Sequence, residues 1–297
     1  MSSICQLSYP IHEVEPYIHW LYFFHAWGFA PRFAAVASLH ACPACRQGWT
    51  ASFPAGEQEK AREAVRLYDD ARRLLSMLEG KLEVQCLYRL CAAMSDGDDL
   101  LIEGIRFPLL RQQRVGQPGE PHLCLSDFVR PASQGIADTV GLFASTVGDS
   151  SLLQATDDPY RQLLLQTLAD RLAEAATEKM HQYVRRTAWG YAPHESLTID
   201  ELHQERFQGI RPAVGYPSLP DQSVNFLLDR LLEMGRIGIR LTENGAMSPH
   251  ASVSGLMLAH PAARYFAVGP IGPDQLADYA RRRGMPVEEL KKFLLSV

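Results

Sequence analysis

The seven residues from Arg211 to Pro217 combine a charged side chain, an aromatic side chain and a restricted backbone. They read RPAVGYP, with two prolines and one glycine. Such a segment cannot continue a helix or a central strand, so it predicts a stiff, turning loop. The loop would hold Arg211 and Tyr216 in fixed directions, and a guanidinium is suited to binding a carboxylate. Composition alone favours a structural loop in which Arg211 pairs with a nearby acid, and ligand binding stays open beside it.

Charged side chains gather in a long predicted helix that contains Asp170, Arg171, Glu174 and Glu178. Arg171 and Glu174 are three residues apart and therefore share a side at the edge of the apolar face. A half-buried carboxylate there would hold a cationic group or a water molecule. Spacing alone favours the alternative, which is an ordinary solvated ladder of charges.

Two adjacent aromatic residues, Tyr265 and Phe266, follow His260 and Pro261 in a segment that we expect to be a strand. Alternation along a strand sends one ring inward and the other outward. One ring would then pack in the core while the other lines a cleft. The pattern alone favours a structural role for both rings.

One pair of cysteines has the spacing of a metal or redox site. Cys42 and Cys45 form a C-x-x-C that follows His40 closely. A single C-x-x-C supplies half of a zinc site or one redox dithiol. The sequence has no second C-x-x-C, no H-E-x-x-H, no P-loop, no G-x-G-x-x-G and no G-x-S-x-G. Inert thiols are therefore the preferred interpretation, and the sequence predicts neither a metal site nor a catalytic residue.

The composition excludes several classes of function. A chain of 297 residues that is 46% hydrophobic can bury a sizeable core. A formal net charge of −5, without a block of Lys or Arg, indicates no binding to nucleic acid or to a membrane surface. No apolar run approaches the roughly 20 residues of a membrane span, and the N-terminus does not resemble a signal peptide. Six cysteines in this length fit a reducing compartment, so we expect a cytoplasmic protein.

The N-terminal half is predicted to supply one helix and several strands. Apolar residues recur at helical spacing over residues 57–79, and Gly80 follows as a stop. Short strands are expected over residues 82–90, 100–107 and 122–129. Turn-forming residues separate these strands at 96–98 and 116–119.

The C-terminal half is predicted to alternate between helices and strands. Asp158 and Pro159 begin a long helix that ends near Trp189 and Gly190. Further helices are expected after the capping box at 198–201, after Asp221, over 273–283 and from Pro286. Strands are expected over 237–242, 252–258 and 264–268, the last two forming a hairpin. Since few parallel βαβ units are evident, the fold class is α+β (mixed α/β), built on an antiparallel sheet.

Several of these segments together resemble the activation domain of cobalamin-dependent methionine synthase. The resemblance rests on WGYAP at 189–193, GIRPA at 209–213, GYP at 215–217, ADRLAE at 169–174 and LSDFV at 125–129. It is dense over residues 122–297. Residues 1–121 are divergent and include a Cys-containing insertion near 40–55. The resemblance implies a single domain over residues 1–297, with a curved antiparallel sheet flanked by helices.

In that family the domain binds S-adenosylmethionine in a cleft and docks over cobalamin. The resemblance implies a reactivation module for reductive methylation of cob(II)alamin in methionine synthesis. The methyl group comes from S-adenosylmethionine, and the electron comes from flavodoxin or a flavoprotein reductase. Holding the methyl group in line with cobalt needs proximity and orientation, so no side chain has to act as an acid or base. This chain would be a stand-alone, accessory part of the methyltransferase, acting in trans on a cobalamin-binding methionine synthase module.

The resemblance also places the ligand contacts. It assigns them to His19, Glu174, Arg211, Ala213, Gly215, Tyr216, Tyr265 and Phe266. Arg211 would bind the methionine carboxylate, and the backbone at Ala213 and Gly215 would approach the ligand. Tyr216 would face the corrin, and Glu174 would line the cleft.

Two of these positions depart from the family's pattern. His19 stands where the family has an aspartate, and Phe266 stands where it has the second tyrosine of a pair. A mostly neutral imidazole offers no negative charge to the ligand's ammonium group. Loss of such a charge-assisted hydrogen bond costs about 1.5–3 kcal/mol. An alternative function therefore stays open: a divergent, non-catalytic binding or regulatory partner of a corrinoid protein, with lost or altered S-adenosylmethionine binding.

Overall fold

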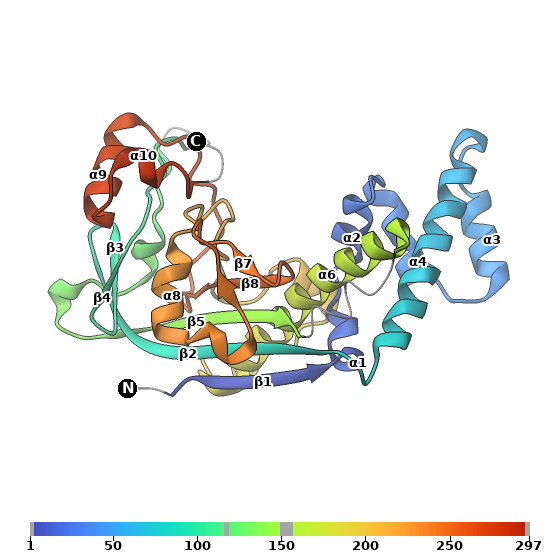
Figure 1. Ribbon diagram of the computed structural model, residues 1–297, viewed down its shortest axis with the longest axis horizontal. Helices are drawn as coiled ribbons and strands as arrows, with labels where there is room; N and C mark the ends of the chain where they lie inside the picture. The colour runs from blue at the N-terminus through green and yellow to red at the C-terminus, as the bar shows by residue number, and fades with distance from the viewer. Residues whose placement is uncertain (1–2, 116–118, 149–156, 295–297) are drawn as a thin grey trace.

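A curved antiparallel sheet forms the centre of the protein, as Figure 1 shows. The computed structural model describes residues 3–115, 119–148 and 157–294. The strand order is β4-β3-β2-β5-β8, and β1 pairs with β2 on the side where β3 also pairs. The strands are β1 (Cys5–Pro10), β2 (Glu83–Asp96), β3 (Asp99–Ile102), β4 (Ile105–Pro108), β5 (Asp138–Val147) and β8 (Ser252–Met257). This arrangement confirms the expected fold class.

Strand β5 joins the N-terminal and C-terminal parts of the chain. It pairs with β2 from Val84 opposite Val147 to Ala93 opposite Asp138, and β8 lies along its other edge. The sequence analysis did not predict β5. Eight of its ten residues are buried, including consecutive ones that face opposite sides of the sheet. A strand buried on both faces lacks the polar alternation that marks a half-exposed strand.

Helix α6 (Pro159–Tyr183) covers one face of the sheet and begins where the sequence predicts. The Asp158 carboxylate accepts a hydrogen bond from the Tyr160 N–H at 3.0 Å and so caps the first turn. Leu168 and Leu172 are buried in the same cluster as Phe143 of the sheet. The helix continues into a π-helical turn over Val184–Ala188. The length of α6 carries its charged residues alongside the C-terminal loops.

Helix α8 (Val224–Leu232) covers the opposite face. Leu228 and Leu232 are buried together with Leu142 of β5, the neighbour of Phe143 on the other side of the strand. Asp221 does not cap α8 directly. Its carboxylate accepts hydrogen bonds from the backbone N–H and the hydroxyl of Ser223, at 2.8 and 2.7 Å, so the helix begins two residues later than expected.

The remaining helices lie mainly at the two ends of the molecule (Figure 1). α2 (Trp20–Ala26), α3 (Pro43–Ala51) and α4 (Gln58–Leu78) gather at one end, and α9 (Pro273–Arg283) and α10 (Val287–Leu290) at the other. Short helices are α1 (Ile11–Val14) and α7 (Ile199–His203). 3-10 turns occupy Glu15–Tyr17, Pro31–Ser38, Ala55–Glu57, Leu125–Phe128, Ala132–Gln134 and Met234–Ile237. Among the described residues, no helix combines the length and apolarity needed to cross a membrane.

Two of the predicted strands are wrong. Residues 122–129 contain a 3-10 turn, because the Asp127 carboxylate accepts the Cys124 N–H at 2.8 Å and closes a capped turn. Residues 264–268 form no regular strand. Instead the Val268 N–H donates to the Pro217 carbonyl oxygen at 2.9 Å, so this segment packs along the proline-rich loop.

Two other predicted strands are shorter or divided. The 3-10 turn at Met234–Ile237 shortens the strand expected over 237–242 to β6 (Arg240–Leu241), which pairs with β7 (Met247–Ser248). The strand expected over 100–107 is the β3–β4 hairpin, and its turn has positive φ at Glu103 and Gly104. Most of the turn predicted at 116–119 lies outside the described residues.

Candidate ligand-binding site

The loop from Arg211 to Pro217 lies along the outer edge of β8 and is hydrogen-bonded to it. The Leu256 N–H donates to the Pro212 carbonyl at 3.0 Å, and the Val214 N–H donates to the Ser254 carbonyl at 2.9 Å. A Cβ on Gly255 would lie 2.2 Å from the Pro212 oxygen, so only glycine permits this approach. The sheet edge therefore fixes the loop that the sequence predicts to be stiff.

Arg211 is held in place from two sides. Its Nη2 donates to Glu178 Oε2 at 2.9 Å, and its backbone N–H donates to the Tyr265 hydroxyl at 2.9 Å. Burial acts to lower the pKa of Arg211, but Glu178, Tyr265 and Glu174 together outweigh it, and the net shift is upward. The guanidinium is thus charged and oriented. The pairing with an acid that composition favours is present, and Glu178 is the acid.

Glu178 is supported by a second layer of charges that the sequence analysis did not assign to the site. The Arg185 side chain is completely buried, and its Nε and Nη2 both donate to the Glu195 carboxylate at 2.8 Å. Its Nη1 lies 3.8 Å from Glu178 Oε1 and 2.7 Å from His181 Nδ1. Burial and the Arg185 charge lower the pKa of His181, which is therefore neutral. The sequence signal that could have placed Glu178 in the site is its spacing, because Glu178 stands four residues after Glu174 on the same helix.

Glu174 bridges helix α6 and the loop. The Tyr216 hydroxyl donates to Glu174 Oε1 at 2.8 Å, and Arg171 Nη1 donates to Glu174 Oε2 at 2.8 Å. The Glu174 side chain is 33% exposed, which makes it the half-buried carboxylate of the sequence analysis rather than a rung of a fully solvated ladder. Tyr216 is 51% exposed. One face of this residue group therefore reaches solvent.

His19 lies at the N-terminus of α2, beside a hollow of about 550 Å³ that His203 also lines. The two imidazole rings stack with centroids 4.2 Å apart. Burial, His203 and Arg171 lower the pKa of His19 to about 4. The imidazole is consequently neutral near pH 7. Arg171 connects the surroundings of His19 to Glu174.

The two neighbouring aromatic residues separate, although not through strand alternation. The Tyr265 hydroxyl meets the Arg211 backbone, as described above. Phe266 packs against the apolar cluster that includes Leu276 and Tyr279 of α9. Its backbone N–H donates to the Ser218 hydroxyl at 3.2 Å. Tyr265 therefore belongs to the polar group around Arg211, whereas Phe266 helps to anchor the chain behind it.

The structure brings most of the expected site residues together. Glu174 is hydrogen-bonded to Tyr216, and Arg211 is hydrogen-bonded to Tyr265. Ala213 and Gly215 belong to the same loop as Arg211 and Tyr216. Gly215 has a φ of +86° and donates its N–H to the Leu219 carbonyl at 2.9 Å, which turns the loop after Val214. His19 lies at the margin of this group and interacts with it through the charge of Arg171. The group is defined here as the arginine–carboxylate cluster: Arg171, Glu174, Glu178, Arg211 and Tyr216.

Buried polar atoms in the arginine–carboxylate cluster have spare hydrogen-bonding capacity. Within the described part of the chain, Arg211 Nε, Arg171 Nε and Glu178 Oε1 have no hydrogen-bond partner. Buried polar atoms are normally paired. Two donors and one acceptor at this place match a small ligand that carries both a carboxylate and an ammonium group.

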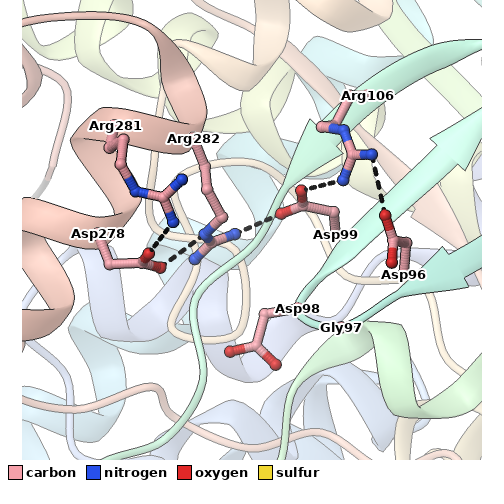
Figure 2. Close-up of a pocket in the computed structure, with 8 residues that line it drawn as sticks. All are labelled: Asp96, Gly97, Asp98, Asp99, Arg106, Asp278, Arg281 and Arg282. Atoms are coloured by element: carbon pink, nitrogen blue, oxygen red, sulfur yellow. Dashed lines mark hydrogen bonds and ion pairs between the residues drawn. The ribbon is translucent and has the colours of Figure 1, made fainter.

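A second hollow, of about 610 Å³, lies between the β2–β3 turn and α9 (Figure 2). Arg106 donates to Asp99 at 2.6 Å and to Asp96 at 2.9 Å. Arg282 donates to Asp278 at 2.7 Å and also contacts Asp99, whose side chain is only 4% exposed. The charges at this hollow thus satisfy one another. We interpret them as a structural network that fastens α9 to the sheet.

The cysteine pair lies elsewhere. Cys42 is the N-cap of α3, and Cys45 stands in the first turn of that helix. In Figure 1, α3 is at the end of the molecule opposite to α9 and α10. Cys42 and Cys45 are free thiols. They take no part in the arginine–carboxylate cluster.

The curved antiparallel sheet and the cluster on its edge define a class of protein: an α+β domain that presents charged groups and an exposed tyrosine on a fixed loop. The family model described as "Vitamin B12 dependent methionine synthase, activation domain" matches residues 10–284. This chain belongs to that family. A solved structure described as the MetH reactivation domain bound to AdoHcy is similar to it, with 36% sequence identity and a TM-score of 0.84. The match covers 98% of this chain and 89% of the other.

Proposed function

We propose that this chain binds S-adenosylmethionine and serves as a reactivation module for methionine synthase. The observation that carries the proposal is the charged, partly buried Arg211, oriented by Glu178 and Tyr265 on a loop fixed to β8. The similarity to a domain with bound AdoHcy supports it. AdoHcy and S-adenosylmethionine share the amino-acid portion, with one carboxylate and one ammonium group.

The proposed contacts follow from the charges of the arginine–carboxylate cluster. Arg211 keeps Nη2 on Glu178 and offers Nε to the ligand carboxylate. Glu178 Oε1 and the half-buried Glu174 lie near the ligand's ammonium group and replace the charge that neutral His19 does not supply. The backbone at Ala213 and Gly215 forms the floor. The Tyr265 hydroxyl positions Arg211 through its backbone N–H. Phe266 packs in the apolar cluster with α9 and does not contact the ligand.

In the methyl transfer, the role of this chain is to orient the reactants. S-adenosylmethionine would supply the methyl group and leave as AdoHcy, and cobalamin on a partner protein would accept the methyl group together with an electron from flavodoxin or a flavoprotein reductase. Tyr216 is exposed and hydrogen-bonded to Glu174, so it can face the corrin while its hydroxyl stays fixed. Holding two reactants in line contributes through proximity, without an acid or base. We propose that the module acts in trans on a cobalamin-binding part of methionine synthase.

We also propose that residues 1–297 fold as one domain. Strand β2 lies within residues 1–121 and β5 lies beyond them, and the two strands pair over ten residue positions. β1 adds a further strand from the N-terminal part to the same sheet. Residues 1–121 therefore complete a sheet that residues 122–297 alone would leave with exposed edges.

A second candidate function is supported by one observation. His19 is neutral and stacked on His203 where an aspartate would bring a negative charge. A domain that keeps the docking surface but binds S-adenosylmethionine weakly or not at all would act as a binding or regulatory partner of a corrinoid protein.

Calorimetric titration of the full chain with S-adenosylmethionine tests the proposal. We expect one binding site, and we expect Arg211→Ala to weaken binding by at least about tenfold, because it removes charge-assisted hydrogen bonds of about 1.5–3 kcal/mol. Arg211→Lys keeps the positive charge but loses the two-pronged hydrogen bonding of the guanidinium. Its affinity should therefore lie between those of the unmodified chain and Arg211→Ala. Arg236→Ala is the matched control, since Arg236 is 50% exposed and pairs with Glu233. Absence of heat at millimolar ligand, or equal affinity in the well-folded Arg211→Ala variant, would overturn the proposal and favour the second candidate.

A further inference from the structure

His40, Cys42 and Cys45 converge at the start of α3. The possible ligand atoms of these three residues all lie within 4.8 Å of one another. The Cys42 N–H donates to His40 Nδ1 at 3.3 Å, which turns the imidazole back toward the cysteines. The Cys45 N–H donates to Cys42 Sγ at 3.4 Å. The tertiary structure thus adds a third ligand to the C-x-x-C that the sequence shows as half a site.

The local backbone holds this group in a defined arrangement. Cys42 has an extended backbone conformation as the N-cap of α3, and Pro43 occupies the first turn of the helix. Arg46 forms an ion pair with Asp69 of α4. The Trp49 and Phe53 rings pack edge to face at 4.9 Å. The ion pair joins α3 to α4, and the ring contact packs α3 against the segment that follows it. The start of the helix therefore presents the three side chains from an element that is held in place.

The ligand types select a class of metal ion. Two thiolates and one imidazole form a set of two sulfur atoms and one nitrogen atom, which suits Zn²⁺. Tetrahedral Zn²⁺, with bonds of about 2.3 Å to sulfur and about 2.0 Å to nitrogen, places ligand atoms about 3.5–3.8 Å apart. Side-chain rotations that bring the ligand atoms closer together by about 1 Å would reach these separations. His40 and Cys45 are exposed, so an ion reaches them without backbone movement.

Three ligands leave one position of a tetrahedral ion for a further group. Among the described residues, no fourth His, Cys, Asp or Glu side chain joins these three. The site is also separate from α6, which carries Glu174 and Glu178, because α4 lies between α3 and α6 in Figure 1. Metal binding here is therefore independent of the proposed function.

We propose that His40, Cys42 and Cys45 bind one Zn²⁺ ion, with the fourth position taken by water. Binding releases the protons of the two thiols, and no oxidant or reductant is needed. The ion ties the loop before α3 to the first turn of that helix.

Titration of the reduced, metal-free full chain with Co²⁺ and then Zn²⁺ tests this site. We expect one equivalent of Co²⁺ to produce the near-ultraviolet charge-transfer absorption of thiolate-bound cobalt, and one equivalent of Zn²⁺ to remove it. Cys42→Ser and Cys45→Ser should abolish the absorption, and His40→Ala should weaken Co²⁺ binding by at least about tenfold. Cys5→Ser is the matched control, because Cys5 is a partly exposed free thiol outside the group.

Two results would overturn the site: no charge-transfer absorption in the reduced protein, or an absorption that persists in the doubly substituted Cys42→Ser, Cys45→Ser chain. A chain that takes no metal after reduction of a Cys42–Cys45 disulfide falls under the first result. The calorimetric titration with S-adenosylmethionine should be the same for the Cys42→Ser variant and the unmodified chain. Failure of the metal site is therefore distinguishable from failure of the proposed function.

Discussion

At the level of single residues, the neutral side chain at position 19 determines which groups can supply negative charge at the proposed site. His19 is neutral because burial, His203 and Arg171 all oppose its protonation. A protonated His19 would be repelled by the positive charge of Arg171. It would also repel the ammonium group of the ligand. The carboxylates Glu174 and Glu178 must then supply the negative charge at the proposed site.

We predict that His19→Asp strengthens S-adenosylmethionine binding by about tenfold to a hundredfold, which corresponds to a charge-assisted hydrogen bond of about 1.5–3 kcal/mol. Calorimetric titration measures the change. His122→Asp is the control, since His122 is exposed and lies in the segment that packs beside Gln112. Unchanged or weaker binding in His19→Asp would mean that the ammonium group lies away from position 19.

At the level of elements, the edge of β8 decides where the arginine loop stands. The Arg211–Pro217 segment uses the Pro212 carbonyl and the Val214 N–H as its contacts with β8, and these contacts require a glycine opposite them. Pro212 has no N–H donor, and at its position the pairing with β8 needs only its carbonyl oxygen as an acceptor. The loop is therefore an irregular continuation of the sheet.

We predict that Gly255→Ala lowers the free energy of unfolding by about 1–3 kcal/mol, because the new methyl group displaces the Pro212 carbonyl. The same displacement moves Arg211, so ligand affinity should fall as well. Urea unfolding and calorimetry measure the two effects. Gly48→Ala is the control: nothing lies within 4 Å of its Cβ position in α3, and it should stabilise the chain by about 0.5–1 kcal/mol. Equal stability of Gly255→Ala and the unmodified chain would show that the loop can leave the edge of β8.

At the level of the whole molecule, two neutral histidines make folding stability depend on pH. His181 is completely buried beside Arg185 and Arg211, and its pKa is lowered, first by burial. His19 is flanked by His203, Arg171 and Asp200, and its pKa is lowered to about 4. In the unfolded chain both imidazoles titrate near 6.5. Below that pH the unfolded chain takes up protons that the folded chain does not, so acid favours unfolding.

We predict that the free energy of unfolding decreases as the pH falls from about 7 to about 5, and that His19→Gln makes this decrease smaller. Carboxylates contribute mainly at lower pH, so this window reports on histidines. Urea unfolding at both pH values measures the difference. The same decrease in the His19→Gln variant and the unmodified chain would show that His19 is protonated in the folded state.

The sequence by itself determined the features that depend on residues close together in the chain. Asp158 and Pro159 fix the start of α6, and the two prolines with Gly215 make the loop stiff. The motifs from 122 onward also identify the family, since they preserve the loop, the helix and their order. These signals are local, and capping and proline effects act within one turn of backbone.

Only the tertiary structure decided which side chains meet. Arg211 binds Glu178 across 33 residues and Tyr265 across 54 residues, and no spacing rule reaches that far. Strand β5 was not predicted, because burial on both faces removes the alternation of polar and apolar residues. The strand predicted over residues 122–129 is wrong, because the Asp127 carboxylate caps a turn there. The candidate site consists of such contacts. The sequence could supply its loop and its charges, but the pairing of those charges depends on how α6 crosses the sheet.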